Sequence, residues 1–341
     1  MTINALARPS LAILDIGHGN AAVVADTKGV VILDAGLGPG LSSFLEDEKI
    51  ETIDVVLLSH VHADHIGGLL HLISTRMFRI GLVRVNSGAE RETAIWADLE
   101  YELEQLGSVG ALTYQPSLGR ESTEDFDHGV IHVEILGPSA ALLSAGLGGK
   151  DSAGRRIVIH SLSAVVRLLH EGRPVALFPG DLDEVGLDEL IRSGIDAKAP
   201  LLIYPHHGGW SGSRDEMGFV MKLCNLVQPE MIALSIGRGR HATPRPEIIE
   251  EVRRRLPHVR VACTQLSERC SANVPLDHGG HLGRHFAMGK HLRHCCAGTM
   301  VVQFDESGMS LSPIAHDHRQ FILNVATTAL CMRPFASPKS Q

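Results

Sequence analysis

The first 35 residues alternate short apolar runs with glycine-containing turns, a pattern typical of strands that follow one another in a meander. Gly17-His18-Gly19-Asn20 separates the first run from the second, and Lys28-Gly29 marks the next turn. The apolar runs span residues 11–16, 21–25 and 30–33. We therefore expect consecutive strands at the start of the chain.

Helical and strand patterns alternate along the rest of the sequence. Helical periodicity is clearest at 91–106, where Ile95, Leu99 and Leu103 recur every four residues. Further helices are expected at residues 41–50, 65–75, 184–193, 214–227 and 246–256. Further strands are expected at residues 55–58, 131–136, 162–169, 175–178, 201–204, 231–236, 259–262 and 298–302. Strands first and mixed units afterwards predict an α/β sandwich of two sheets with helices outside.

Composition narrows the class of protein. The chain has 341 residues, of which 44% are apolar, enough for about two domains or one large α/β domain with an appendage. No glycine-rich phosphate loop follows the first strand, so a nucleotide cofactor is not expected. No apolar run reaches the roughly 18 residues of a membrane-spanning helix, and the first residues lack the pattern of a signal peptide. We therefore expect a cytoplasmic protein with no membrane contact.

Charge is distributed unevenly along the chain. The formal net charge is −8, but residues 1–235 carry 17 Lys and Arg against 31 Asp and Glu, whereas residues 236–341 carry 14 against 8. A basic final third on an acidic protein suggests an anionic ligand. A solvated surface of mixed charge is the alternative.

Three histidines and a carboxylate fall within six residues, directly after the apolar run 55–58: His60, His62, Asp64 and His65. On an extended turn, His60 and His62 point the same way and can share one cation. Asp64 and His65, where the chain turns into a helix, can hold a second. Imidazole and carboxylate suit zinc, and also iron or manganese, and two such ions close together form a binuclear hydrolytic site.

This segment resembles the HxHxDH signature of the metallo-β-lactamase superfamily, and other pieces follow in that superfamily's order. Asp34 resembles the early aspartate that supports the site from behind the ligands. Asp181, in Phe-Pro-Gly-Asp, resembles the carboxylate that bridges the two metals, and the doublet His206-His207 resembles the late histidine motif. The resemblance covers roughly residues 10–262 and implies a four-layer αββα sandwich.

Finer details are similar to one branch, the hydrolase domain of ComEC-type DNA-uptake proteins and its free-standing relatives. They are the opening ILDIGHGNA, the later LFPGDLD, the HHG doublet and LSIGRGRHATPRPEIIEEV. Where that branch usually reads GQGD, this chain has Gly17-His18-Gly19-Asn20, and Gly209-Trp210 stands where a serine normally follows the doublet. The membrane segments of the uptake proteins are not in this sequence, so the resemblance does not imply DNA transport.

Superfamily members commonly supply a third histidine to the first metal, between the signature and the bridging aspartate. The candidates are His128, His132 and His160. His160 directly precedes the strand that leads to Asp181, at a loop-to-strand junction, where catalytic side chains tend to lie. We therefore favour His160 as a ligand, with a position on the loop surface as the alternative. We expect structural roles for the other two histidines.

The resemblance also implies roles for the ligands. Two cations would share Asp181 and activate a water molecule. Asp64, His65 and one histidine of the doublet would hold the second cation, which would polarise the substrate. The other histidine of the doublet, with His241, would hydrogen-bond a phosphoryl oxygen or protonate a leaving group. The expected catalytic residues are thus Asp64, His207 and His241, with a purely structural role for His241 as the alternative.

Four of the six cysteines gather late in the chain, at Cys263, Cys270, Cys295 and Cys296. Six cysteines are too few for a disulfide scaffold in a chain of this length. Because the first of the four ends one expected strand and the last two lead into another, a structural zinc ion would tie the intervening insertion to the core. Buried unreactive thiols and a redox function are the alternatives.

Arginines crowd the region after the doublet. Arginine binds phosphate in a bidentate manner, so those nearest the site would hold a phosphodiester backbone. We single out Arg238 and Arg240, which lie in a glycine-rich turn, and expect a solvated face for residues 253–255.

The leading hypothesis is a hydrolase with two zinc ions, or with manganese or iron, that cleaves a phosphodiester of a nucleic acid or nucleotide. Because superfamily members also open lactones, esters and lactams, a small-molecule hydrolase is the runner-up. An inert regulatory or interaction module is the third reading. We expect a core over residues 1–262, a Cys/His-rich insertion over 263–298, and closing strands and a tail over 299–341.

Overall fold

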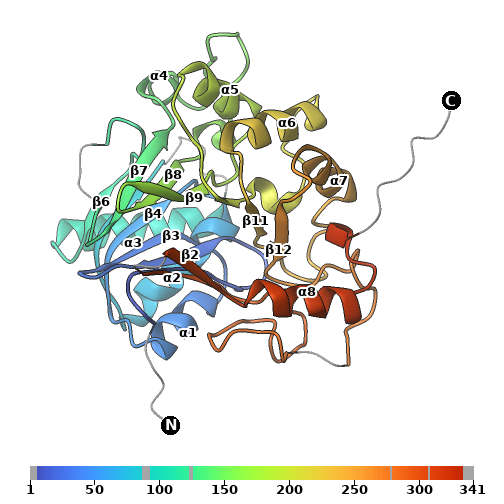
Figure 1. The fold of residues 1–341 in the computed structure, drawn as a ribbon. Coiled ribbons are helices and arrows are strands. Elements are labelled where there is room, and N and C mark those ends of the chain that lie inside the picture. Colours follow the sequence, from blue (N-terminus) through green and yellow to red (C-terminus); the bar gives the residue numbers. More distant parts are fainter. Residues whose placement is uncertain (1–5, 87–92, 123–125, 277–278, 306–307, 333–341) are drawn as a thin grey trace.

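The computed structural model describes residues 6–86, 93–122, 126–276, 279–305 and 308–332. Two sheets face each other across the middle of the molecule (Figure 1). In spatial order, the eight-stranded sheet consists of β14 (Gly308–Ser312), β13 (Met300–Asp305), β1 (Ser10–Ile13), β2 (Ala21–Ala25), β3 (Val30–Ala35), β4 (Thr52–Leu58), β5 (Arg79–Val85) and β6 (Thr113–Gln115). The six-stranded sheet consists of β12 (Arg260–Cys263), β11 (Met231–Leu234), β10 (Leu201–Ile203), β9 (Arg173–Phe178), β8 (Val165–His170) and β7 (Ile131–Gly137).

Each sheet changes from antiparallel to parallel pairing along the chain. In the first sheet β1, β2 and β3 form an antiparallel meander, whereas β3 to β6 run parallel. In the second sheet β7, β8 and β9 are antiparallel, and β9 to β12 run parallel. Parallel neighbours need crossover connections, which helices provide here. They are α1 (Gly40–Asp47), α2 (Ala63–Thr75), α3 (Ala94–Ser108), α5 (Glu184–Arg192), α6 (Glu216–Val227) and α7 (Pro246–Arg255).

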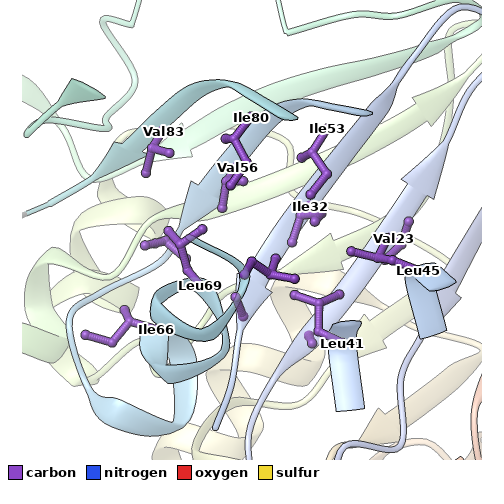
Figure 2. Close-up of a cluster of buried hydrophobic side chains, with 14 of the residues drawn as sticks. Val23, Ile32, Leu41, Leu45, Ile53, Val56, Ile66, Leu69, Ile80 and Val83 are labelled. Carbon is purple, nitrogen blue, oxygen red and sulfur yellow. The ribbon is translucent and has the colours of Figure 1, made fainter. Parts of the chain in front are cut away.

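Three apolar clusters hold four layers together. One lies between the two sheets and includes Val31 and Leu168. A second packs α1 to α3 on the outer face of the first sheet, and Figure 2 shows Leu45 and Leu69 of these helices beside strand residues such as Val56. The third packs α5 to α7, together with α8 (Ala315–Asn324), on the outer face of the second sheet. The expected four-layer αββα sandwich is therefore confirmed.

The loops that carry the candidate ligands lie at the carboxyl ends of the parallel strands in each sheet. Loops that follow parallel strands meet at the carboxyl ends of those strands, where ligands bind in open α/β sheets. Asp34 lies near the end of β3, and His60 follows β4. In the other sheet, Asp181 follows β9 and His206 follows β10. The two sheets thus bring segments distant in sequence to one place.

The chain from β12 to β13 contains an isolated bridge between Gln265 and Cys295. It is fastened to the first strands, because the amide groups of Met288 and Gly289 donate to the carbonyl and carboxylate oxygens of Asp15. β13 then pairs antiparallel with β1.

Several expected elements differ from those observed. The strand expected at 162–169 begins only at Val165, because Ile159–Leu162 form a 3-10 turn that faces the loops after β4. The elements β5, β6, α8 and the short helix α4 (Ala140–Ala145) are not among those expected. The expected tail at 333–341 lies outside the described residues. Within the described ranges, no helix is both long enough and apolar enough to cross a membrane.

Candidate metal centre

The connection between β4 and α2 carries the first histidines of the centre. His60 and His62 lie in an extended segment, while Asp64 and His65 fall in the first turn of α2. The turn is pressed against the end of β3, where a Cβ on Gly68 would lie 2.5 Å from the carbonyl oxygen of Gly36. Only glycine permits such a close backbone approach, and it brings the start of α2 next to the site.

One group of donors comprises His60, His62 and His160. Their ligand atoms lie within 4.8 Å of one another, and Nε2 of His160 is 3.1 Å from Nδ1 of His62. The expectation that His160, of the three candidates, lies with the signature histidines agrees with this geometry. His132 instead pairs with Asp127.

A second group comprises His18, Asp64 and His207. The Oδ2 atom of Asp64 is 3.3 Å from Nε2 of His207 and 3.5 Å from Nε2 of His18. The loop that carries His18 is held in place because the amide of Asn20 donates to the backbone carbonyl of Asp64. A side chain from the turn between β1 and β2 therefore belongs to the centre.

Asp181 belongs to two further groups, each of which shares a histidine with the first group. It belongs to one group with His60 and His65 and to another with His160 and His206. Its Oδ2 lies 3.5 Å from Nε2 of His65 and 3.6 Å from Nδ1 of His206. This central position agrees with the bridging role that the resemblance implies.

The donor set fits metal ions. The contacts to Asp64 and Asp181, at 3.3 to 3.6 Å, are longer than hydrogen bonds, which are about 2.7–3.2 Å. They match the roughly 3.3 Å that separates two ligands each about 2.0–2.1 Å from a tetrahedral zinc ion. The Nε2 atoms of His60, His65 and His207 are buried without a hydrogen-bond partner among the described residues. Because a buried polar nitrogen without a partner is costly, a cation is the natural complement of these three atoms.

Groups behind the ligands fix their orientation. The Nδ1 of His65 lies 2.8 Å from Oδ2 of Asp34, which also accepts hydrogen bonds from the amide and hydroxyl of Ser59. Such a carboxylate–histidine pair sets the tautomer and raises the basicity of a metal ligand. Asp34 holds a left-handed backbone conformation with φ of 57°, a strain that is tolerated at functional sites. Asp34 thus lies where the resemblance places it.

Both histidines of the doublet face donor groups. They have left-handed backbone conformations, with φ of 52° at His206 and 53° at His207. The Nδ1 of His207 donates to the carbonyl of Ser235 at 2.7 Å, which leaves Nε2 available as a ligand beside Asp64. The Nε2 of His206 donates to a carbonyl at 3.2 Å, and its Nδ1 faces Asp181. From the sequence, only one histidine of the doublet was expected to bind metal. In the structure, each of the two belongs to a group of potential metal ligands.

The pKa values of the cluster suit metal ligation. Burial lowers the pKa of His60 well below its usual range, and the neighbouring His65 lowers it further. Burial and the proximity of His206 lower the pKa of His160 to about 4. His65 differs, because Asp34 and Asp181 outweigh burial and raise its pKa well above the usual range. The pKa values of Asp64 and Asp181 are lowered because neighbouring histidines outweigh burial. The neutral imidazoles of His60 and His160 therefore lie near ionised carboxylates, as metal binding requires.

The substrate-binding arginines expected from the sequence have different surroundings. The guanidinium of Arg238 donates to the carbonyls of Leu266, Ser271 and Ala272, so it anchors the following segment and does not face the donor groups. Arg240 is exposed. His241, expected to be catalytic, lies against His18, with ring centroids 4.2 Å apart.

The four cysteines proposed as zinc ligands are buried, and three of them, Cys263, Cys270 and Cys296, line one small cavity. Cys295 directs its thiol to Asp15 at 3.2 Å, while Cys296 Sγ lies 3.3 Å from Nε2 of His318. Among the described residues, the groups of three or more donors within 4.8 Å contain no cysteine. The geometry favours the alternative of buried thiols, because Sγ of Cys270 accepts from the amide of Leu330.

His18 is a functional candidate that the sequence argument missed. It lies 40 residues or more before the other donors and was considered only as part of a glycine-rich turn. The sequence did contain one indication of this role: His18 stands where the ComEC-type hydrolase domains usually have glutamine. Its contact with Asp64 depends on how the turn after β1 folds over α2, which local spacing does not reveal.

The family model described as the metallo-beta-lactamase superfamily matches residues 14–223. Among solved structures, the chain is similar to the metallo-beta-lactamase fold protein YhfI from Bacillus subtilis, with 12% identity, a TM-score of 0.45, and coverage of 75% of this chain and 96% of that one. It is also similar to Igni18, a metallo hydrolase from the archaeon Ignicoccus hospitalis, with 15% identity, a TM-score of 0.44, and coverage of 74% and 94%.

Human tRNase Z, short form, is a further similar structure, with 14% identity, a TM-score of 0.37, and coverage of 67% of this chain and 93% of that one. No curated protein matches the sequence significantly.

Proposed function

Because the chain belongs to the metallo-β-lactamase superfamily, we propose that it is a binuclear metal-dependent hydrolase whose substrate is a phosphodiester. The observation that carries the metal-dependent part is the set of His and Asp donor groups, with buried Nε2 atoms on His60, His65 and His207 that have no hydrogen-bond partner in the described part of the chain. An inert regulatory module would have no reason to maintain such costly unpaired nitrogens.

In this proposal, His60, His62 and His160 hold one cation, and Asp64, His65 and His207 hold the other, with Asp181 shared. Zinc is the first choice for these ligands, and manganese or iron also suits them. The bound ions would lower the pKa of a water molecule and stabilise negative charge on the substrate. Asp34 fixes His65, and the Ser235 carbonyl fixes His207, so that the nitrogens facing the site are held in one direction.

We assign His18 as an additional ligand beside Asp64. Its Nε2 faces the same carboxylate oxygen as that of His207, and its ring lies 4.4 Å from the ring of His207. Burial lowers the pKa of His18, so its imidazole is neutral near pH 7. His206 and His241 then remain as the histidines that would contact the substrate or its leaving group.

The substrate class rests on the charge of the turn that follows β11. Residues 237–245 contain three arginines and one histidine and no acidic residue. Arg240 and His241 are exposed there, and His241 lies against His18 at the edge of the donor groups. An anionic phosphodiester would be attracted to this turn, whereas a neutral lactone or ester would gain nothing from it. The similarity to the ComEC-type hydrolase domains points to the same class.

Turnover by the metal-loaded protein tests the proposal. The substrates are bis-p-nitrophenyl phosphate, single-stranded DNA, RNA, cyclic nucleotides and a lactone, each assayed with added zinc or manganese. We expect Arg240→Ala to lower the catalytic efficiency on phosphodiesters by about tenfold, because a charge-assisted contact is worth about 1.5–3 kcal/mol when well ordered and less when exposed.

The matched control is Arg192→Ala, an exposed arginine in the last turn of α5. It should leave turnover unchanged. Hydrolysis of the lactone without turnover of any phosphodiester would select the small-molecule alternative. No turnover of any substrate by protein that contains two metal ions would favour the regulatory reading.

A further inference from the structure

A cavity of about 460 Å³ lies at the opposite end of β12 from the metal centre. Its lining includes Arg260, the first residue of β12, and residues from α8 and from the end of α7. The loops of the metal centre follow the carboxyl ends of the parallel strands, whereas Arg260 lies at the amino end of its strand. The cavity is therefore a separate site, and its size is within the range of small-molecule pockets, about 300–1,000 Å³.

The polar lining of this cavity is basic. It includes the side chains of Arg253, Arg260, Arg319, His258 and His318, and no acidic side chain lines it in the described part of the chain. One contact of Arg253 is 3.4 Å from its Nη1 to the carbonyl of Leu330. The positive charges are thus gathered around a space that contains no compensating carboxylate.

Arg260 is the residue that makes this arrangement informative. Its Nη2 is buried and has no hydrogen-bond partner among the described residues. Burial lowers the pKa of Arg260, and its charge in turn contributes, after burial, to lowering the pKa of His318 to about 3. An uncompensated buried cation is strongly destabilising.

Two other arginines, Arg167 in β8 and Arg155 in the loop before it, are each compensated by acidic side chains. Arg167 is 10% exposed and pairs with Glu134 at 2.7 Å while also donating to the backbone carbonyl of Asp196. Arg155 pairs with two aspartates. Among the described residues, Arg260 has no such acidic partner. It lines a cavity that is large enough to admit an anion.

We propose that this cavity binds a small molecule that carries a phosphate group, with the phosphate held by Arg260 and Arg319. Arginine is suited to phosphate because its planar guanidinium donates two parallel hydrogen bonds. The apolar part of the lining, including Val259, Ile322 and Met332, would contact the rest of the molecule. The site does not depend on the proposed hydrolase activity.

Calorimetric titration of the full-length protein tests this site. The protein is first treated with chelator, so that metal ions in the catalytic centre do not bind the probe. The probes are inorganic phosphate, pyrophosphate and AMP, in chloride buffer. We expect one equivalent to bind, and we expect Arg260→Met to weaken binding at least tenfold. Arg319→Met, at an exposed position, should weaken it by a smaller factor, and Arg192→Met should leave it unchanged.

Thermal unfolding without the probe provides a second readout. If Arg260 is uncompensated, Arg260→Met should unfold at the same temperature as wild type or higher, while losing the stabilisation that AMP gives to wild type. Unchanged probe affinity in both Arg260→Met and Arg319→Met would overturn the proposal. A single-stranded oligonucleotide that binds more tightly than AMP, and whose affinity falls in Arg260→Met, would also overturn it in favour of a nucleic-acid surface.

Discussion

Two parts of the molecule are rich in potential metal ligands, and they are built in opposite ways. In the metal centre, donors from five loops point toward one another, and three buried imidazole nitrogens have no hydrogen-bond partner among the described residues. In the segment from Cys263 to Cys296, the thiols are equally buried and three of them line one small cavity, but in the described part of the chain no three sulfurs lie within 4.8 Å of one another. Cys295 and Cys296 instead contact Asp15 and His318. The number of potential ligand residues in a segment is therefore weak evidence for a metal site. Unpaired donor atoms that lie close together are strong evidence.

The difference has a physical origin. Histidine and carboxylate are costly to bury unpaired, so a fold that buries several of them together must compensate them with one another or with a cation. A thiol behaves as a small apolar group with weak hydrogen bonding and is readily buried anywhere in a core. Burial of Cys263 accordingly raises the pKa of its thiol well above the usual range, and it stays protonated.

The strongest test of the metal centre is Asp64→Ala. This variant removes a carboxylate that His18 and His207 both face, so we expect turnover to fall about a thousandfold or more, with loss of about one of two metal ions. Turnover and elemental analysis check this. Asp98→Ala, on the exposed face of α3, is the control and should retain both. Full activity in protein without transition metal would refute the assignment.

His18→Gln should have the next largest effect. Loss of one nitrogen beside Asp64 is expected to weaken binding of the second cation by about 10- to 100-fold, the range typical when a supporting group of a metal site is removed. Competition between the protein and a chelator for cobalt measures this independently of activity. His132→Gln, which alters a histidine paired with Asp127, should not change cobalt affinity. Equal affinity in His18→Gln and wild type would exclude ligation by His18.

The pH dependence of stability tests the surroundings of His318, which contacts the Cys296 thiol. Burial and the nearby Arg260 lower the pKa of His318 to about 3, against about 6.5 in the unfolded chain. Below pH 6.5 the unfolded chain therefore binds a proton that the folded protein excludes, so stability falls as the pH decreases toward 3. At pH 5 this residue costs on the order of 2 kcal/mol.

Replacement of the histidine, as in His318→Gln, should remove that part of the acid sensitivity. Urea unfolding of the two metal-free proteins at pH 7 and pH 5 measures the difference, since the other histidines are common to both. The same loss of stability between the two pH values in variant and wild type would show that His318 does not titrate as its surroundings indicate.

Cys270→Ser should have the smallest effect. Because no three sulfurs lie within 4.8 Å of one another among the described residues, we expect unchanged metal content and a loss of about 1 kcal/mol of stability from placing a hydroxyl in an apolar position. Elemental analysis and thermal unfolding check this, with Cys224→Ser as a buried cysteine outside the cluster. Loss of one metal ion in Cys270→Ser alone would restore the structural zinc that the sequence suggested.

Local pattern was sufficient for elements whose buried face repeats regularly. The helices α2, α5, α6 and α7 lie within a few residues of their expected positions. The helix α8 was missed because His318, Phe321 and Ile322 are the residues it buries, amid charged neighbours. The edge strands β6 and β14 have few buried residues or lack a strong alternation, so their pairing partners define them more than their own sequence does.

The sequence by itself determined the first half of the centre, because His60, His62, Asp64 and His65 lie within six residues and the direction of their side chains follows from a strand that turns into a helix. Tertiary structure alone decided that His18 lies beside Asp64 and that both histidines of the doublet face other donor groups. It also decided that Arg238 binds backbone carbonyls of the following segment and does not face the donor groups. Those outcomes depend on the pairing of parallel strands and on two sheets packed face to face. Such contacts join residues far apart in the chain, 46 positions for His18 and Asp64 and 143 for Asp64 and His207, and no local spacing encodes them.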